Sequence, residues 1–147
     1  MRIAQTVIRT ATLVALAAAP GLLQAQQREA IGRSSATLTQ AIRVGNLVFA
    51  SGALPSGGAG ADTTIQGQTR STLNNVKAVL ELAGTTMQNA VKCTVFLIEG
   101  ADFRGMNEAY AEFWPVAPPA RSTVVVKALV VPNAKLEIEC IAVMPTM

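Results

Sequence analysis

The spacing of hydrophobic residues along this chain predicts where its helices lie, and runs rich in β-branched residues predict its strands. From residue 65 to residue 83, apolar side chains are spaced by three, four and three residues, which is the spacing of one face of a helix. These positions are Leu73, Val76, Leu80 and Ala83. Gly84 follows, and glycine is typical of the residue just past a helix end. The segment therefore predicts an amphipathic helix that ends at Ala83.

The same spacing recurs after residue 102 and predicts a second, shorter helix. Its apolar positions are Phe103, Met106, Tyr110 and Phe113. Asp102 stands where a side chain could cap the free backbone N–H groups of the first turn. Prolines at positions 115, 118 and 119 are expected to end this helix, because proline cannot continue one.

Runs rich in β-branched residues predict the strands. "QAIRV" and "LVFAS" flank Gly45-Asn46, which is a two-residue hairpin signal. "AVKCTVFLIEG" lies between the two helices, and "STVVVKALV" and "KLEIECIAVM" follow the second helix with a turn at Pro132-Asn133. Residues 26–36 are polar and predict loosely ordered chain.

The resulting order, β-β-α-β-α-β-β, predicts one domain of the α+β class, in which a mixed sheet has two helices on one face. The opposite face has no second layer from the same chain, although "STVVVKALVV" is apolar at nearly every position. Burial against another copy of the chain is the simplest solution. We therefore expect an oligomer that forms through the open face of the sheet.

The last two strands carry charges that need an explanation, because a charge in a packed sheet is costly unless it is paired, exposed or used. In "LEIECIAV" the even-numbered positions are apolar and are expected to face the helices, which places Glu137 and Glu139 on the open face. Arg121 begins the neighbouring strand. Composition alone favours a structural ion pair between Arg121 and one of the glutamates. The alternative is that Arg121 receives the carboxylate of a substrate while a glutamate handles a proton or a water.

The first 25 residues differ from the rest of the chain. Arg2 and Arg9 precede an apolar run at 11–19, which has the length of the hydrophobic region of a secretory signal and is too short to span a bilayer. "LQA" at 23–25 offers a cleavage point without a lipid-accepting cysteine. We expect residues 1–25 to be a cleavable signal and 26–147 a single mature domain, periplasmic or secreted and free of the membrane. An uncleaved anchor or a misassigned start codon is the alternative.

Charge and residue content limit the chemistry. Two of the 12 Lys and Arg residues lie in the predicted leader, which leaves 10 basic against 9 acidic residues and no run of basic side chains. A nucleic-acid-binding surface needs clustered basic residues, so we expect no nucleic-acid partner. The chain has no histidine, which excludes Ser-His-Asp and Cys-His catalysis and histidine-based zinc sites. Catalysis would have to use carboxylates, Arg, hydroxyls, backbone groups and water.

Two cysteines, Cys93 and Cys140, lie in predicted strands. Export would permit a disulfide, but a disulfide needs a close approach of the two Cα atoms that sequence does not reveal. Two free, buried thiols are the favoured interpretation, and a disulfide is the alternative.

Four segments of the chain resemble the RidA/YjgF family. They are "NLVFASGALP", "TRSTLNNVKAVLELAG", "VKCTVFLIEGADFRGMNEAYAEFW" and "PPARSTVVVKALVVPNAKLEIECIAV", of which the last is the most specific. The resemblance implies a chorismate-mutase-like fold, a homotrimer with ligand sites between subunits, and no metal or organic cofactor. It also implies hydrolysis of reactive enamines and imines, such as 2-aminoacrylate and 2-iminopropanoate, to 2-keto acids and ammonia.

The resemblance also implies roles for single residues. Arg121 matches the arginine that grips the substrate carboxylate, and Glu137 matches the residue that positions the attacking water. Three further positions match residues of the substrate pocket: Gly52, Asn107 and Thr123. Thr123 stands where some members have cysteine, and Glu139 is expected to be structural.

One departure from the family lies near the N-terminus. The family often shows Gly-Pro-Tyr-Ser-Gln-Ala where this chain has "ATLTQA", so Leu38 replaces a tyrosine whose hydroxyl contributes to the pocket. Losing such a hydrogen-bonding partner costs on the order of 1 to 3 kcal/mol. The leader is a second departure, because the familiar deaminases act in the cytosol.

These departures leave a second hypothesis beside the imine deaminase. It is a non-catalytic relative that binds small carboxylates or acts as a chaperone-like or stress protein. A third hypothesis, ribonuclease activity, is disfavoured because the basic patch is missing.

Overall fold

A computed structural model of the chain describes residues 27–57 and 61–146. The predicted leader, residues 1–25, lies outside the described residues. Within the part of the chain that is described, no helix is long and apolar enough to cross a membrane.

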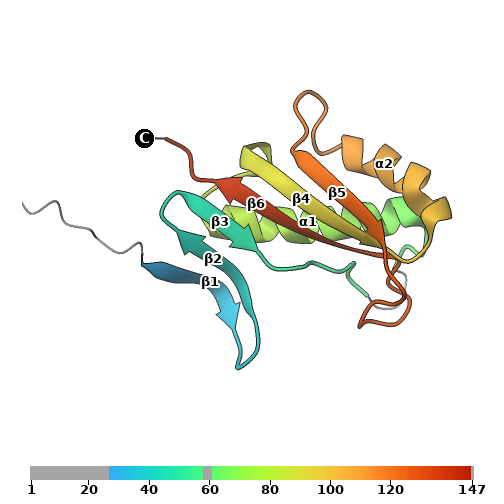
Figure 1. Cartoon of the computed structure of the whole chain (residues 1–147), viewed down its shortest axis with the longest axis horizontal. Helices are drawn as coiled ribbons and strands as arrows, with labels where there is room; N and C mark the ends of the chain where they lie inside the picture. The colour runs from blue at the N-terminus through green and yellow to red at the C-terminus, as the bar shows by residue number, and fades with distance from the viewer. Residues whose placement is uncertain (1–26, 58–60, 147) are drawn as a thin grey trace, which may run out of the picture.

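One mixed six-stranded sheet and two helices make up the fold (Figure 1). The strands are β1 (Arg28–Ser34), β2 (Thr39–Val44), β3 (Leu47–Ala50), β4 (Ala90–Leu97), β5 (Ala120–Val125) and β6 (Leu136–Val143). The helices are α1 (Ile65–Leu82) and α2 (Phe103–Ala111), with short 3₁₀ turns at Met87–Asn89 and Gly100–Asp102. The strand order in the sheet is β1-β2-β3-β6-β4-β5, and only β4 and β5 run parallel.

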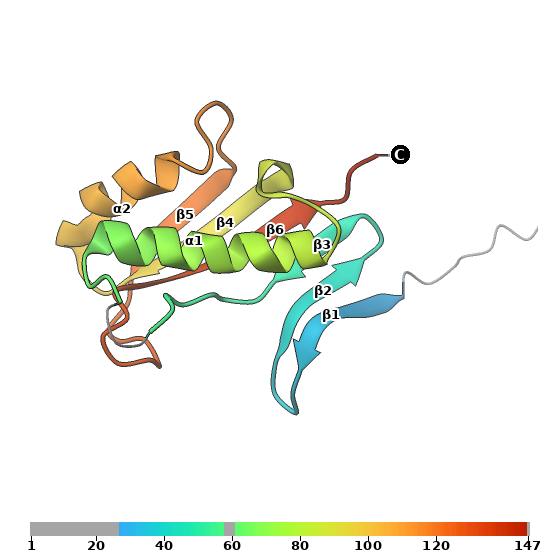
Figure 2. The ribbon, with the colours of Figure 1, turned by 180° about the vertical axis from the view of Figure 1, so that it is seen from behind.

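Both helices cover the same face of the sheet, as predicted (Figure 2). The buried stripe of α1 contains Leu73, Val76 and Leu80, which pack with the even-numbered side chains of β6 in a single core. From Leu136 to Ala142 these even positions are 0 or 1% exposed, which confirms that they face the helices. The odd-numbered side chains of β6 therefore face the opposite way.

The predicted turns are present. Gly45 lies in the β2–β3 hairpin with φ 60°, and Gly84 follows α1 with φ 84°, a backbone region that glycine enters without steric cost. Asn133 has φ 65° in the turn before β6, which is tolerated better by asparagine than by most residues.

The expectation for residues 26–36 was wrong, because Arg28–Ser34 form the edge strand β1. β1 pairs antiparallel with β2, with Ile31 opposite Ala41, and the register shifts between Ile31 and Ser34. Six of its seven residues are exposed, so the strand is held by backbone pairing and leaves little hydrophobic pattern in the sequence.

The region around α2 also differs from the prediction in two details. Asp102 makes no side-chain hydrogen bond that caps α2, and its carboxylate instead accepts a hydrogen bond from Lys135 Nζ at 3.2 Å. β5 ends at Val125, well before the predicted end, because its partner β4 ends at Leu97. The apolar residues beyond β5 belong to a loop, in which Val130 is 89% exposed.

The interpretation of the cysteines as free thiols was wrong. Cys93 and Cys140 are directly opposed on β4 and β6, their Cα atoms are 4.1 Å apart, and a disulfide joins them. Both residues are buried on the helix side of the sheet. Cross-strand register decides this pairing, and register is not readable from two isolated strands.

Candidate functional site

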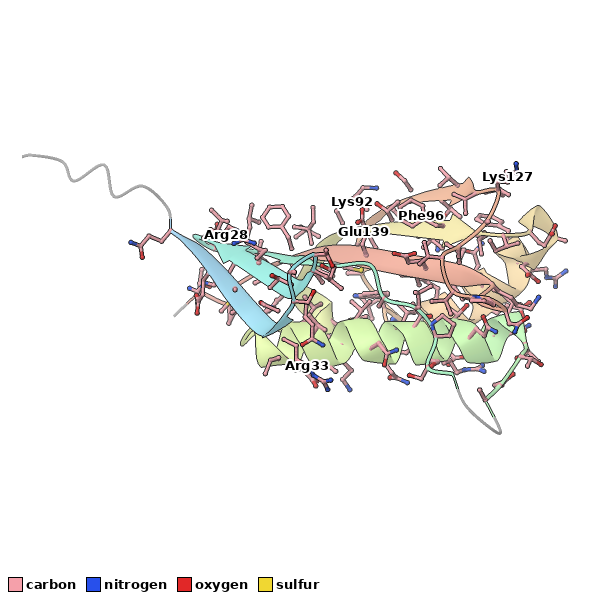
Figure 3. The ribbon with its side chains drawn as sticks, turned by 90° about the horizontal axis from the view of Figure 1, so that it is seen from below. Arg28, Arg33, Lys92, Phe96, Lys127 and Glu139 are labelled. Atoms are coloured by element: carbon pink, nitrogen blue, oxygen red, sulfur yellow. A yellow bond between two sulfur atoms is a disulfide. The ribbon has the colours of Figure 1, made fainter. Side chains whose placement is uncertain are left out.

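Glu137 lies on the open face of the sheet, where a loop brings a glycine against it. It is opposite Phe96 of β4, whose side chain projects from the face away from α1 (Figure 3). After β3 the chain returns to β6 through one bridge, in which the N–H of Ala53 donates to Ile138 O at 2.8 Å and the N–H of Ile138 donates to Ala53 O at 3.0 Å. This bridge places Gly52 beside the carboxylate.

A side chain at Gly52 would meet the side chain of Glu137. A Cβ atom there would overlap Glu137 Oε1 and would lie 2.9 Å from Glu137 Cδ. A larger residue at this position would therefore displace the Glu137 side chain, whereas glycine leaves the carboxylate where it lies. The predicted pocket residues Gly52 and Glu137 are thus brought together within one chain.

Leu38 is 58% exposed and lies in the connection between β1 and β2. The Ser35 hydroxyl accepts a hydrogen bond from the N–H of Leu38 at 3.0 Å, and the N–H of Ser35 donates to Leu38 O at 2.7 Å. Leu38 and Gly52 line one groove of about 650 Å³, together with Leu82 and Ala78 of α1. Glu137 does not line this groove, and Gly52 is the residue that both Leu38 and Glu137 approach. We refer to Gly52 and Glu137 as the glutamate group.

Arg121 lies on the edge strand β5 and turns toward α2. Its Cζ is 4.6 Å from the ring centroid of Tyr110 and 5.8 Å from that of Phe103, and its Nη1 is 3.8 Å from Met106 Sδ. These distances are in the range of cation–π contacts. Arg121 is half-buried in this position.

Thr123 and Asn107 lie in the same part of the molecule as Arg121. Thr123 is two residues further along β5 and so faces the same side, and its buried hydroxyl has no hydrogen-bond partner among the described residues. Asn107 is half-buried and follows Met106 on α2. We refer to Asn107, Arg121 and Thr123 as the arginine group.

The ion pair that composition favours is not formed. Arg121 is in register with Cys93, whose side chain is on the helix side, whereas Glu137 is in register with Phe96 on the open side. Among the described residues, no carboxylate oxygen lies within 4 Å of the Arg121 guanidinium. Glu139 is exposed on the open face, opposite Thr94 (Figure 3). The glutamate and arginine groups of one protomer therefore lie on opposite faces of the sheet.

The residues around Arg121 were missed as functional candidates. Phe103, Met106 and Tyr110 have the spacing of one helix face, and this spacing was interpreted as core packing. Met106 and Tyr110 are indeed buried, but Phe103 is 45% exposed, and all three contact Arg121. Burial raises the pKa of Tyr110 to about 12, and the positive charge of Arg121 opposes part of this rise.

A comparison with known proteins assigns the fold and these residues to a family. The model of the family described as Endoribonuclease L-PSP matches residues 27–144, nearly all of the described chain. The chain belongs to the RidA/YjgF/L-PSP family. Within the described residues, no group of three Cys, Asp or Glu side chains is placed to hold a metal ion.

Individual relatives agree with this assignment. The chain is 44% identical over 107 residues to Reactive Intermediate Deaminase A, chloroplastic, of Arabidopsis thaliana, a match that spans 71% of this chain and 57% of that protein. It is 42% identical over 106 residues to the mitochondrial protein mmf2 of Schizosaccharomyces pombe, spanning 70% of this chain and 84% of that protein. The crystal structure of the Escherichia coli YjgF gene product superposes with a TM-score of 0.70 and 35% identity, covering 78% of this chain and 98% of that one.

Proposed function

We propose that this protein hydrolyses small 2-imino acids, and the enamines that equilibrate with them, to 2-keto acids and ammonia. Its 44% identity to a reactive intermediate deaminase supports this function. The observation that carries the proposal is the half-buried Arg121, which has no carboxylate partner among the described residues. Such a guanidinium is suited to bind the carboxylate of a substrate through two parallel hydrogen bonds.

The complete site would form between subunits of a homotrimer. The glutamate and arginine groups lie on opposite faces of one sheet, and this placement within one protomer supports a site that two subunits share. Apolar side chains on the open side favour burial against a second copy: Phe49 is 41% exposed and Val124 is 45% exposed. The arginine group of one subunit would then meet the glutamate group of the next.

The proposed reaction needs few groups, because an imine carbon is already electrophilic. Arg121 would hold the substrate carboxylate and fix the imine carbon at a water bound by Glu137. Glu137 would take one proton from the attacking water and return it to the imine nitrogen. In the resulting carbinolamine, Glu137 would move the hydroxyl proton to the amino nitrogen, so that the C–N bond breaks and ammonia leaves as the C=O bond of the 2-keto acid forms.

A direct assay tests this function. 2-Iminopropanoate is generated in situ, and pyruvate formation is compared for the wild type, Arg121→Ala and Glu137→Ala. We expect the wild type to accelerate hydrolysis and both variants to lose the acceleration. Failure of the wild type, or full activity of Arg121→Ala, would contradict the proposal.

A second candidate function is supported by Leu38. Because this side chain brings no hydroxyl to the groove that it shares with Gly52, the protein could bind small carboxylates without hydrolysing imines. The assay above separates the two functions when it is combined with calorimetric binding of a 2-keto acid. Binding without turnover would favour the non-catalytic function.

Ribonuclease activity, which the family description mentions, is a weaker candidate. The basic side chains are dispersed, and five of them are paired with carboxylates: Arg43, Arg70, Lys77, Arg104 and Lys135. A surface of this kind does not offer the clustered charge that binding of RNA requires.

We further propose that the protein is exported by its N-terminal segment. The disulfide between Cys93 and Cys140 supports this proposal, because disulfides persist in oxidising compartments and are rare in the cytosol. The Arabidopsis and fission yeast relatives are named as chloroplastic and mitochondrial. Intact mass of the protein from a periplasmic fraction tests export, with a start near Gln26 as the expected result and the full-length chain in the cytoplasmic fraction as the contrary one.

A further inference from the structure

The guanidinium of Arg121 is held by aromatic rings, and the way it is held bears on how it binds a ligand. A guanidinium has five N–H donors in one plane. In the described residues its only hydrogen-bond acceptor is the sulfur of Met106, which is a weak one, at 3.8 Å from Nη1. The guanidinium also lies over the faces of two rings, those of Phe103 and Tyr110. The donors are therefore left largely free although the group itself is half-buried.

We propose that Tyr110 and Phe103 act as positioning residues that orient the Arg121 guanidinium for a carboxylate ligand. This inference rests on the proposed function and adds the device that prepares its anion-binding group. A ring face attracts the cation without accepting its N–H hydrogen bonds. The two aromatic side chains thus restrict the arginine without occupying the donors that the ligand needs.

A carboxylate in place of the rings would not serve the same purpose. An arginine side chain has many rotamers, and an acidic neighbour is the usual means of fixing one of them. Such a neighbour would occupy the forked donors and would compete with the substrate carboxylate for them. Aromatic contacts avoid this competition, because a ring face attracts the guanidinium without occupying its N–H donors.

Tyr110 is buried and lies nearer to the guanidinium than Phe103 does, which makes it the stronger of the two contacts. Its residue is 4% exposed, and its ring lies 4.7 Å from the ring of Trp114. Trp114 Nε1 donates a hydrogen bond to Met87 O at 2.7 Å, so the stack is anchored to the segment before β4. Phe103, at the start of α2, is 45% exposed, and its ring centroid is 5.8 Å from Arg121 Cζ.

The test compares ring removal with ring retention. The affinity of the full-length protein for 2-oxobutanoate, a 2-keto acid of the class the reaction releases, is measured by calorimetry for the wild type, Tyr110→Phe, Tyr110→Leu and Phe103→Leu. We expect Tyr110→Phe to bind like the wild type, because the ring face is kept. Tyr110→Leu should bind about tenfold more weakly, and Phe103→Leu about threefold, from the strength of cation–π contacts at buried and exposed sites.

The kinetic readout separates positioning from loss of structure. Because the rings act on carboxylate binding, Tyr110→Leu should raise KM for the imine with a much smaller change in kcat, and Tyr110→Phe should restore KM. Phe113→Leu is the matched control, because Phe113 is an aromatic residue that stacks near Trp114, with centroids 6.3 Å apart, and makes no cation–π contact with Arg121. Thermal unfolding of each variant identifies those that fail to fold, and the exposed Phe103 is the position whose variant is expected to fold normally.

Two outcomes would overturn the inference, and they are distinguishable. If the wild type binds 2-oxobutanoate and Arg121→Ala does not, while folded Tyr110→Leu and Phe103→Leu bind like the wild type, the rings have no positioning role and the proposed function stands. If the wild type itself binds no 2-keto acid and hydrolyses no imine, the proposed function fails and the inference fails with it.

Discussion

The glutamate group and the arginine group are built in different ways. The surroundings of the Glu137 carboxylate are determined by the backbone, because the β-bridge between Ala53 and Ile138 holds Gly52 beside it. The position of the Arg121 guanidinium is determined by side chains, because the aromatic rings of Phe103 and Tyr110 on α2 contact it. An added methyl group at Gly52 would therefore displace the Glu137 carboxylate, whereas the arginine group depends on ring contacts that a similar ring can replace.

The largest effect is expected from Gly52→Ala. The new methyl group would overlap Glu137 Oε1, so the carboxylate must move. A displacement of about 1 Å in a catalytic group costs on the order of 100-fold in rate, which is the loss of kcat/KM that we expect. Binding of 2-oxobutanoate should change far less, because Arg121 is untouched.

Gly57→Ala is the matched control for this prediction. A Cβ at Gly57 would meet no heavy atom within 4 Å, and the residue is exposed. Its kcat/KM should equal that of the wild type. Equal activity of the two glycine variants would show that the backbone at Gly52 does not determine the position of the Glu137 carboxylate.

The disulfide offers the next test, because it joins the strands between the two groups. β4 pairs with β5, which carries Arg121, and with β6, which carries Glu137. We expect Cys93→Ala combined with Cys140→Ala to lower the free energy of unfolding by about 2 to 4 kcal/mol, the usual contribution of a native disulfide. Chemical denaturation measures this change, and a double variant as stable as the wild type would contradict it.

Leu38→Tyr tests the glutamate group from its other side. A tyrosine there would restore a hydroxyl to the groove that Leu38 shares with Gly52. One new hydrogen bond contributes about 1 kcal/mol, so kcat/KM should rise about fivefold. Initial rates on 2-iminopropanoate provide the measurement, with Leu38→Phe as the control that adds the ring alone. A rise of the same size in both variants would assign the gain to the ring rather than to the hydroxyl.

The smallest effect at neutral pH concerns Tyr110, which contacts the arginine group. Because the pKa of this phenol is raised to about 12 in the folded state from about 10 in the unfolded chain, its contribution to stability is complete below pH 10. That contribution is lost as the pH rises toward 12, since the unfolded chain loses the proton first.

Absorbance of the phenolate measures this titration without ambiguity, because the chain has one tyrosine. We expect no phenolate signal in the folded protein at pH 10.5. A midpoint near pH 10 with the fold intact would show that Tyr110 is not enclosed as described.

Much of the fold could be predicted, because its core elements carry a clear period. The spacing of Leu73, Val76 and Leu80 on α1 and the alternation along β6 were both confirmed by burial. β1 could not be predicted, since its exposed side chains leave only backbone pairing to define it.

The candidate site residues stay predictions from the family resemblance, and their arrangement could not be predicted from the sequence. Resemblance to the family picked out Arg121 and Glu137, yet composition suggested that they pair with each other. The register that places them on opposite faces depends on three strands far apart in the sequence. The same register opposes Cys93 and Cys140, so the ion pair and the free thiols were wrong for one physical reason.

The central claim, that the two groups meet only between subunits, has a direct test. Arg121→Ala and Glu137→Ala are each purified as inactive protein, unfolded together in equal amounts and refolded. If one subunit supplies the arginine and the next supplies the glutamate, random mixing in a symmetric ring leaves about a quarter of the sites intact. We predict that about a quarter of the wild-type activity on 2-iminopropanoate returns. A mixture that refolds into the same oligomer and stays inactive would contradict the account.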